Sequence, residues 1–175
     1  MIHYSMISFP GDRPVNEDSI GAFTKDNKAC FILCDGLGGH GMGDAASQLV
    51  VKVFEDLFQK SDDMTNFIGQ AFMASESLLL MEQQQKHIKD KMKTTGVTLV
   101  IDDDVAHIGH VGDSRLYVFK WNRVKMRTID HSVPQMLVKS REIKESEIRY
   151  HPDRNLLLRV LGVDWDEPMY ELSEP

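Results

Sequence analysis

Cys30-Phe-Ile-Leu-Cys-Asp-Gly-Leu-Gly-Gly-His-Gly-Met-Gly-Asp44 is the stretch that decides the fold of this 175-residue chain. Its first five residues are apolar and predict a buried strand, which ends at the carboxylate of Asp35. Five glycines follow within positions 36–43, and a helical pattern begins directly after them. A charge at the tip of a buried strand is costly unless a cation pairs with it, and glycines let backbone atoms approach an ion closely. Asp35 and Gly36 are therefore the first candidates for a metal site.

The composition is that of one globular domain, with 42% hydrophobic and 27% charged residues. The net charge of −7 argues against non-specific nucleic-acid binding, which needs a basic face. No apolar run approaches the roughly 20 residues of a membrane span, and the N-terminal residues show no signal-peptide pattern. Cys30 and Cys34 would lie about 13 Å apart on one strand, too far for a disulfide. We therefore expect free thiols in a cytoplasmic protein.

Hydrophobic periodicity predicts an α+β protein. Strands are expected at 2–8, 19–24, 29–34, 94–101, 105–111, 116–119 and 124–129. Apolar residues at helical spacing predict a helix that begins at Asp44 and a second helix over about 64–89, both in the core. Short helices are expected over 133–139 and 145–150. The later strands should form an antiparallel meander, and residues 164–175 show no strong pattern.

Two familiar interpretations of the glycine-rich stretch fail on the residues themselves. The spacing Gly36-x-Gly38-x-x-Gly41 matches a dinucleotide fingerprint, but a second helix follows where a βαβ unit needs a strand. A cysteine phosphatase needs an arginine in the loop that holds the phosphate, and the loop after Cys34 has none. The neighbouring carboxylate would also raise the pKa of the Cys34 thiol, which is the wrong direction for a nucleophile.

Carboxylates at strand ends and beside glycine predict a site of oxygen ligands. Glu17, Asp18, Asp35 and Asp113 stand in such places, and hard oxygen ligands without a histidine–cysteine cluster favour Mg²⁺ or Mn²⁺ over zinc. Arg13 could clamp phosphate oxygens in a bidentate way. Each residue alone also fits a structural role, Asp18 as a cap, Arg13 in a surface ion pair and Asp113 in a turn. The prediction therefore rests on their combination.

Six motifs follow one another along the chain. They are Arg13-Pro-Val-Asn-Glu-Asp18, Cys34-Asp-Gly-Leu-Gly-Gly-His40, Thr94-Thr-Gly-Val-Thr98, His110-Val-Gly-Asp-Ser-Arg115, Asp130-His-Ser132, and His151-Pro-Asp-Arg-Asn155 with Arg159-Val-Leu-Gly162. In this order they resemble the metal-dependent serine/threonine protein phosphatases of type 2C, the PPM family, in their bacterial form. The resemblance extends from about Asp12 to Gly162. It implies a two-sheet antiparallel β-sandwich flanked by helix pairs, with the metal ions at one end.

The resemblance also implies a role for each site residue. Asp35 would bridge two metal ions, and Glu17 and the carbonyl of Gly36 would bind one of them. Arg13 would hold the substrate phosphate. Asp113 would bind a third, weaker ion, and Asp18 would hydrogen-bond metal-bound water from the second shell.

Two departures from the family pattern bear on activity. Leu37 stands where some relatives have a histidine proposed as the leaving-group acid, and His40 is only a weak substitute. The family also has a later Asp-Gly and a near-terminal Asp-Asn that supply aspartates to the metal pair, and this chain stops before either. We therefore expect residues 1–175 to form a single phosphatase domain without its C-terminal part, with an open sheet edge that favours self-association.

The favoured hypothesis is a protein phosphatase that hydrolyses phosphoserine and phosphothreonine through a metal-bridging hydroxide, with Mn²⁺ or Mg²⁺ as cofactor and phosphorylated proteins as substrates. By itself this chain should be weakly active or inactive. A second hypothesis is a non-catalytic phosphatase-like interaction module, and a third, weaker one is a nucleotide-binding domain.

Overall fold

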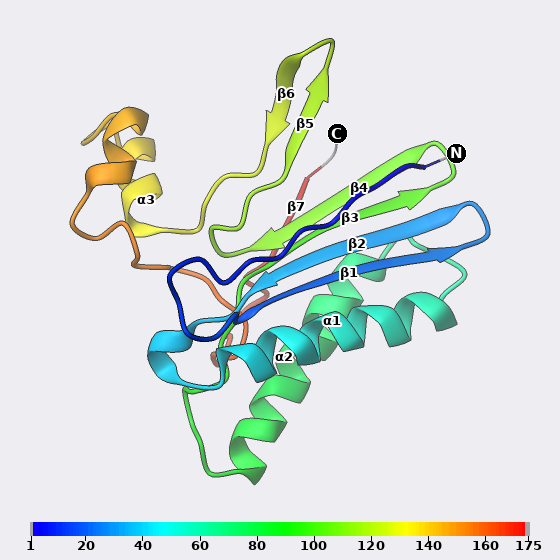
Figure 1. Cartoon of the computed structure of the whole chain (residues 1–175), viewed down its shortest axis with the longest axis horizontal. Helices are drawn as coiled ribbons and strands as arrows, with labels where there is room; N and C mark the ends of the chain where they lie inside the picture. Colours follow the sequence, from blue (N-terminus) through cyan, green and yellow to red (C-terminus); the bar gives the residue numbers. More distant parts are fainter. Residues whose placement is uncertain (1, 174–175) are drawn as a thin grey trace.

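The computed structural model describes residues 2–173, with the backbone alone at His40. Its centre is a five-stranded antiparallel sheet in the order β1-β2-β3-β4-β7 (Figure 1). Since β2 and β3 run antiparallel, the chain between them is no βαβ unit, which joins parallel strands. The dinucleotide-binding alternative is thereby excluded. The strands are β1 (Asp18–Lys25), β2 (Lys28–Asp35), β3 (Gly96–Asp102), β4 (Val105–Val111) and β7 (Glu171–Ser173).

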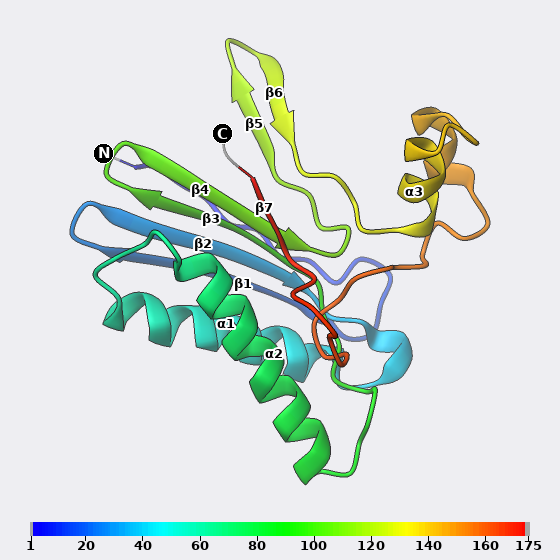
Figure 2. The ribbon, with the colours of Figure 1, turned by 180° about the vertical axis from the view of Figure 1, so that it is seen from behind.

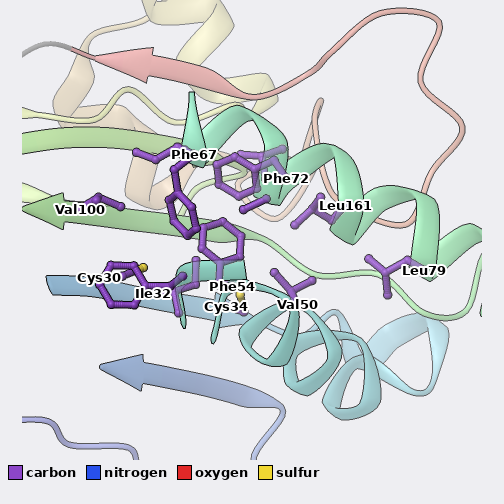
Figure 3. Packing of buried hydrophobic residues seen from close by; sticks show 14 of the residues in the cluster. Cys30, Ile32, Cys34, Val50, Phe54, Phe67, Phe72, Leu79, Val100 and Leu161 are labelled. Atoms are coloured by element: carbon purple, nitrogen blue, oxygen red, sulfur yellow. The ribbon is translucent and has the colours of Figure 1, made fainter. Parts of the chain in front are cut away.

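Two long helices, α1 (Gly43–Lys60) and α2 (Phe67–Gln85), cover one face of this sheet (Figures 1 and 2). Cys30 and Cys34 of β2 are buried beneath them together with phenylalanines from both helices (Figure 3). The ring of Phe54 meets those of Phe72 and Phe67 edge to face, at centroid distances of 5.2 and 5.9 Å. Each fully buried side chain of this size stabilises the fold by about 1.5–3 kcal/mol. The core therefore lies between the helices and the sheet.

The opposite face of the sheet is crossed by the N-terminal segment, residues 2–17 (Figures 1 and 2). The Tyr4 ring contacts the ring of Phe31 edge to face at 5.3 Å, whereas Ile7 is 89% exposed. The predicted strand over residues 2–8 is wrong, because this segment lies over the face of the sheet and joins no ladder at its edge. Its apolar alternation reflects contact with the sheet on one side only.

A separate two-stranded sheet is formed by β5 (Tyr117–Lys120) and β6 (Arg123–Arg127) (Figure 1). Its two-residue turn, Trp121-Asn122, has φ values of 50° and 60°, as tight hairpins of this hand require. The remaining elements are short: α3 (Val133–Lys139) and two 3-10 helices, η1 (Gly38–His40) and η2 (Glu145–Tyr150).

The predicted α+β class, with antiparallel sheets and helices, is confirmed. Within residues 2–173 the second sheet is only the β5–β6 hairpin and the long helices form one pair, so the expected face-to-face sandwich is only partly present. Helix α2 ends at Gln85, before the predicted Lys89, because His87 has a left-handed φ of 55°. The C-terminal stretch without a pattern contributes β7, which pairs with β4. Among the described residues, no helix has the length and apolarity needed to cross a membrane.

Candidate metal and phosphate site

The ends of β1 and β2 bring the predicted carboxylates together. The register of the ladder places Asp18 opposite Asp35, and the backbone N–H of Gly36 donates to the carbonyl of Glu17 at 3.1 Å. Asp35 is one of the odd-numbered residues of β2, which face away from the helices because side chains alternate along a strand. The site therefore lies at the end of the sheet where β2 leads into η1 and α1 (Figure 1).

The glycines after Asp35 make room for the Glu17 side chain. A Cβ added at Gly38 would lie 1.7 Å from Glu17 Oε2, and one at Gly36 would lie 2.3 Å from the carbonyl oxygen of Gly43. At Gly39, by contrast, an added Cβ would meet no described atom within 4 Å. At Gly36 an added side chain would meet backbone atoms of Gly43 and Glu17, so only glycine fits there. At Gly38 it would displace the Glu17 carboxylate, so the glycine at this position allows that carboxylate to lie where it does.

Asp35 is fixed by two threonines that precede β3. Its N–H donates to the hydroxyl of Thr95 at 3.1 Å, and its carbonyl accepts from the Thr95 N–H and the Thr94 hydroxyl, both at 2.9 Å. The Thr95 hydroxyl also exchanges a 2.7 Å hydrogen bond with Ser114. Thr95 thus joins the backbone of Asp35 to the residue next to Asp113.

These contacts converge on a cavity of about 550 Å³, called the site cavity below. Its lining includes four of the predicted site residues, Arg13, Asp35, Gly36 and Asp113. Arg13 is exposed, and its guanidinium lies 3.7 Å from Glu17 Oε2. Glu17 lies beside Arg13, and Asp18 lies opposite Asp35 in the β1–β2 ladder. The structure thus brings all six predicted positions to one place.

The charges of this site repel one another. Partial burial, followed by the charges of Asp18 and Asp113, raises the pKa of Asp35 to about 6, and Arg13 opposes the shift. Burial and the charge of Asp130 raise the pKa of Asp113 as well. A set of carboxylates whose protonation is favoured in this way is one that a bound cation would stabilise.

The carboxylates do not by themselves form a closed set of ligands. Among residues 2–173, the only three acidic, histidine or cysteine side chains that can place ligand atoms within 4.8 Å of one another are His110, His131 and Glu171. The carboxylate site therefore has oxygens spread around a cavity, and any ion bound there would need further ligands such as a backbone carbonyl or water.

The cluster of His110, His131 and Glu171 is organised by hydrogen bonds. His131 Nδ1 accepts from the N–H of Gly112, so its proton is on Nε2, which faces Glu171 Oε2 at 3.3 Å. The two imidazole rings are stacked, with their centroids 4.5 Å apart and an angle of 16° between their planes. The ring nitrogens of the two residues therefore lie in nearly parallel planes. Burial and His110 lower the pKa of His131 to about 4. These features describe a neutral His131 that stacks on His110 and packs against β7, and the proton on His131 Nε2 opposes metal binding.

Several residues of this site carried no predicted role. Thr94 and Thr95 stand in a motif that was recognised without an assigned function, and Ser114 and Lys93 were not singled out. Lys93 lines the site cavity. No local sequence pattern indicates this position, because it depends on how distant segments pack together. The side chain of His40, considered as a substitute leaving-group acid, lies outside the part of the chain that the structure describes.

The cysteines are free and buried, as predicted. Burial raises the pKa of the Cys30 thiol to about 12, and burial together with Asp35 raises that of Cys34 further. A thiol protonated at neutral pH is a poor nucleophile, which excludes the cysteine-phosphatase interpretation.

Comparison with known proteins gives a consistent set of relatives. The family model described as protein phosphatase 2C matches residues 12–132. The serine/threonine phosphatase stp of Listeria welshimeri is 31% identical over 156 residues, which are 85% of this chain and 62% of that protein. The serine/threonine protein phosphatase PstP of Mycobacterium tuberculosis is 29% identical over 164 residues, 93% of this chain and 31% of that protein. The chain thus spans less than two thirds of the length of these curated relatives.

Solved structures agree in fold. A structure described as a bacterial serine phosphatase superposes with a TM-score of 0.87 at 29% identity, covering 95% of this chain and 70% of the other. The catalytic domain of PstP, described as a complex with 2 manganese ions, superposes with a TM-score of 0.79 at 28% identity, covering 96% and 70%. Because the family model covers more than half of the sequence, this chain belongs to the protein phosphatase 2C family, in the bacterial form of these relatives.

Proposed function

We propose that the protein is a metal-dependent serine/threonine phosphatase that removes phosphate from phosphoserine and phosphothreonine of cytoplasmic proteins. The observation that carries this proposal is the convergence of a guanidinium, Arg13, with the carboxylates of Asp35 and Asp113 around one cavity. Residues 1–175 would belong to a single phosphatase domain. Self-association through a sheet edge remains a further prediction.

The residues present fit a divalent cation. All the candidate ligands are hard oxygens, from Glu17, Asp35, Asp113 and the backbone of Gly36. Burial, followed by the charges of Asp18 and Asp113, raises the pKa of Asp35, and a bound cation would oppose both effects. Asp35 would hold two ions, Glu17 and the carbonyl of Gly36 would hold one of these two, and Asp113 would hold a third. Mn²⁺ and Mg²⁺ both suit such ligands. When bound, they would supply the positive charge that neutralises the phosphate and activates a water molecule for attack on phosphorus.

The chain's own residues position the reacting groups. Arg13, exposed at the rim of the site cavity, would bind two phosphate oxygens with its planar guanidinium and so orient the phosphoryl group. The carboxylate of Asp18, opposite Asp35 in the ladder, would accept a hydrogen bond from the attacking water. Thr95 would hold the backbone of Asp35 in place throughout, since it bonds both the N–H and the carbonyl.

The test is hydrolysis of p-nitrophenyl phosphate and of a phosphothreonine peptide by this chain, with and without millimolar Mn²⁺. Turnover that requires Mn²⁺ and is lost in Asp35→Asn would support the proposal. Turnover that is unchanged in Asp35→Asn would overturn the role of Asp35. Calorimetric titration with Mn²⁺ accompanies the assay.

The same experiment weighs the alternative of a non-catalytic interaction module. A folded chain with neither turnover nor Mn²⁺ binding would favour that module. A folded chain that binds Mn²⁺ without turnover would instead indicate a metal site whose catalytic ligand set is incomplete.

A further inference from the structure

A second cavity, of about 680 Å³, adjoins the site cavity. Asp113 and Asn155 line both cavities, so the two are continuous at these residues. We call the second cavity the arginine groove, because Arg115, Arg127, Arg149 and Arg154 line it. These are four of only eight arginines in a chain whose net charge is −7. Half of the arginines of an acidic chain thus line one cavity, which indicates that positive charge has a function there.

Two of the four arginines are already paired. Arg115 binds Asp130 through Nε and Nη2, at 2.6 and 2.5 Å, and Arg127 lies 2.6 Å from Glu145. These ion pairs build the walls of the groove. They also neutralise two of its three carboxylates and leave only Asp113, at the boundary with the site cavity.

The other two guanidiniums are available. Arg149 and Arg154 are exposed, and neither has a carboxylate within 4 Å among residues 2–173. The backbone just after Arg154 is held in place, because the N–H of Val133 donates to the carbonyl of Leu156 and the N–H of Leu158 to that of His131. The turn between Arg149 and Arg154 is closed by hydrogen bonds from the N–H of His151 to the carbonyl of Ile148 and from the N–H of Arg154 to that of His151. A pair of unpartnered guanidiniums on an anchored backbone is suited to bind phosphate or carboxylate oxygens.

From this geometry we propose that the arginine groove is a subsite for a second anionic group on the phosphoprotein substrate. The preferred substrates would be segments in which another phosphate, or a cluster of Asp and Glu, lies a few residues from the phosphate held at Arg13. This proposal rests on the proposed phosphatase function, since it places one phosphate in the site cavity. The arginine groove would select substrates with a second anionic group, a property that the residues of the site cavity do not determine.

The direct test is binding of fluorescent phosphothreonine peptides to the metal-free chain, measured by anisotropy. The peptides carry a second phosphoserine, a glutamate or an alanine at two to six residues from the phosphothreonine. At one or two adjacent spacings, the doubly phosphorylated peptide should bind about five- to tenfold more tightly than the alanine peptide, as two exposed charge contacts allow. The glutamate peptide should lie between them, which distinguishes a phosphate requirement from a general acidic one.

The variant Arg149→Gln/Arg154→Gln should remove this preference. The matched control is Arg123→Gln/Lys125→Gln, which removes the same charge from exposed positions of β6 outside the groove. Arg149→Lys/Arg154→Lys keeps the charge but loses the planar fork, so its preference should be intermediate. All four substituted side chains are exposed, and thermal unfolding of each variant checks the fold.

Equal affinity for singly and doubly phosphorylated peptides at every spacing would overturn the proposal. An equal loss in the control variant would do the same, because it would show general charge attraction only. Hydrolysis of p-nitrophenyl phosphate is measured in parallel. Hydrolysis without any peptide preference removes the subsite and leaves the phosphatase function. A groove-dependent preference with neither hydrolysis nor Mn²⁺ binding supports the subsite and removes the phosphatase function alone.

Discussion

At the scale of the residue, Asp35 has opposing effects on stability and on metal binding. Burial raises its pKa to about 6 in the metal-free fold, so above pH 6 the folded chain carries a carboxylate charge that lowers its stability. We expect Asp35→Asn to unfold at a higher temperature than the native chain at pH 8 without metal, and to lose the increase in Tm that Mn²⁺ produces. Thermal unfolding with and without Mn²⁺ measures both. A variant that retains the full Mn²⁺ response would contradict the assignment.

Gly38 offers a sharper test of the same site, because the chain supplies its own control. Gly38→Ala would place a methyl group against the Glu17 carboxylate, whereas Gly39→Ala would meet open space. We expect Gly38→Ala to weaken Mn²⁺ binding about tenfold, as displacement of supporting groups commonly does, and Gly39→Ala to leave it near the native value. Calorimetric titration of both variants gives the comparison. Equal losses would show that Glu17 is not a ligand.

Thr95 is predicted to act through Asp35 and not as a ligand itself. Thr95→Val leaves the N–H of Asp35 and the hydroxyl of Ser114 without their partner, at a cost of about 1–3 kcal/mol. Thr98→Val, three residues further on in β3, removes a comparable bond to the carbonyl of Phe31. Both variants should lose stability in urea denaturation, but only Thr95→Val should also weaken Mn²⁺ binding. Restoration by Thr95→Ser would confirm that the hydroxyl is responsible.

At the scale of the element, α2 carries a buried carboxylate away from the site. Glu76 is 4% exposed, and its Oε2 accepts from the N–H of Gly162 at 2.7 Å. Its Oε1 has no partner among the described residues. Burial, opposed by the bond from Gly162, raises its pKa from 4.5 to about 7. The native state therefore binds this proton more tightly than the unfolded chain does.

The stabilising contribution of this proton is complete below about pH 4.5 and is lost as the pH rises through 7. Between pH 5 and pH 8, Glu76 should lower the free energy of unfolding of the native chain by about 1–3 kcal/mol. Glu76→Gln should remove that part of the pH dependence. Urea denaturation of both proteins at several pH values measures the difference. Parallel pH profiles for the two would exclude a raised pKa at Glu76.

The elements differ in how well the sequence predicts them. Strand β2 is predictable from its run of apolar residues, because it is buried, and both long helices are predictable from apolar residues at helical spacing, because each packs one side against the core. Strand β7 has three residues and is held by pairing with β4, which leaves no local pattern. Residues 2–8 show an alternation that comes from lying on a sheet without joining it.

The candidate site was predictable to a similar degree. Its carboxylates were predicted because each stands at a strand end or beside glycine, where a charge is costly unless a cation pairs with it. Thr95 and the arginine groove were not, because their roles depend on contacts between segments distant in sequence. Arg115 and Arg154, for example, meet around one cavity only after folding.

At the scale of the whole molecule, the sheet has an incompletely covered edge. Strand β7 pairs with β4 only from Ile108 to His110, so in residues 2–173 the first part of β4 has a neighbour on one side alone. Val105 in that part is 55% exposed. We expect the protein to self-associate through this edge at high concentration, and Val105→Lys to reduce the association. Sedimentation velocity over a concentration series measures it, and a monomer at every concentration would contradict the prediction.

The ladder between β1 and β2 also determines where this protein can tolerate changes in length. Eight residues of each strand span about 26 Å, from the turn at Asp26 to the pair of Asp18 and Asp35. Inserting one residue within β1 would move Asp18 to the other face of the sheet, and inserting two would shift it by about 7 Å. Insertions at the turn would leave the pair intact. The number of residues is therefore fixed near the site, whereas the far end of the hairpin can accept a change in length.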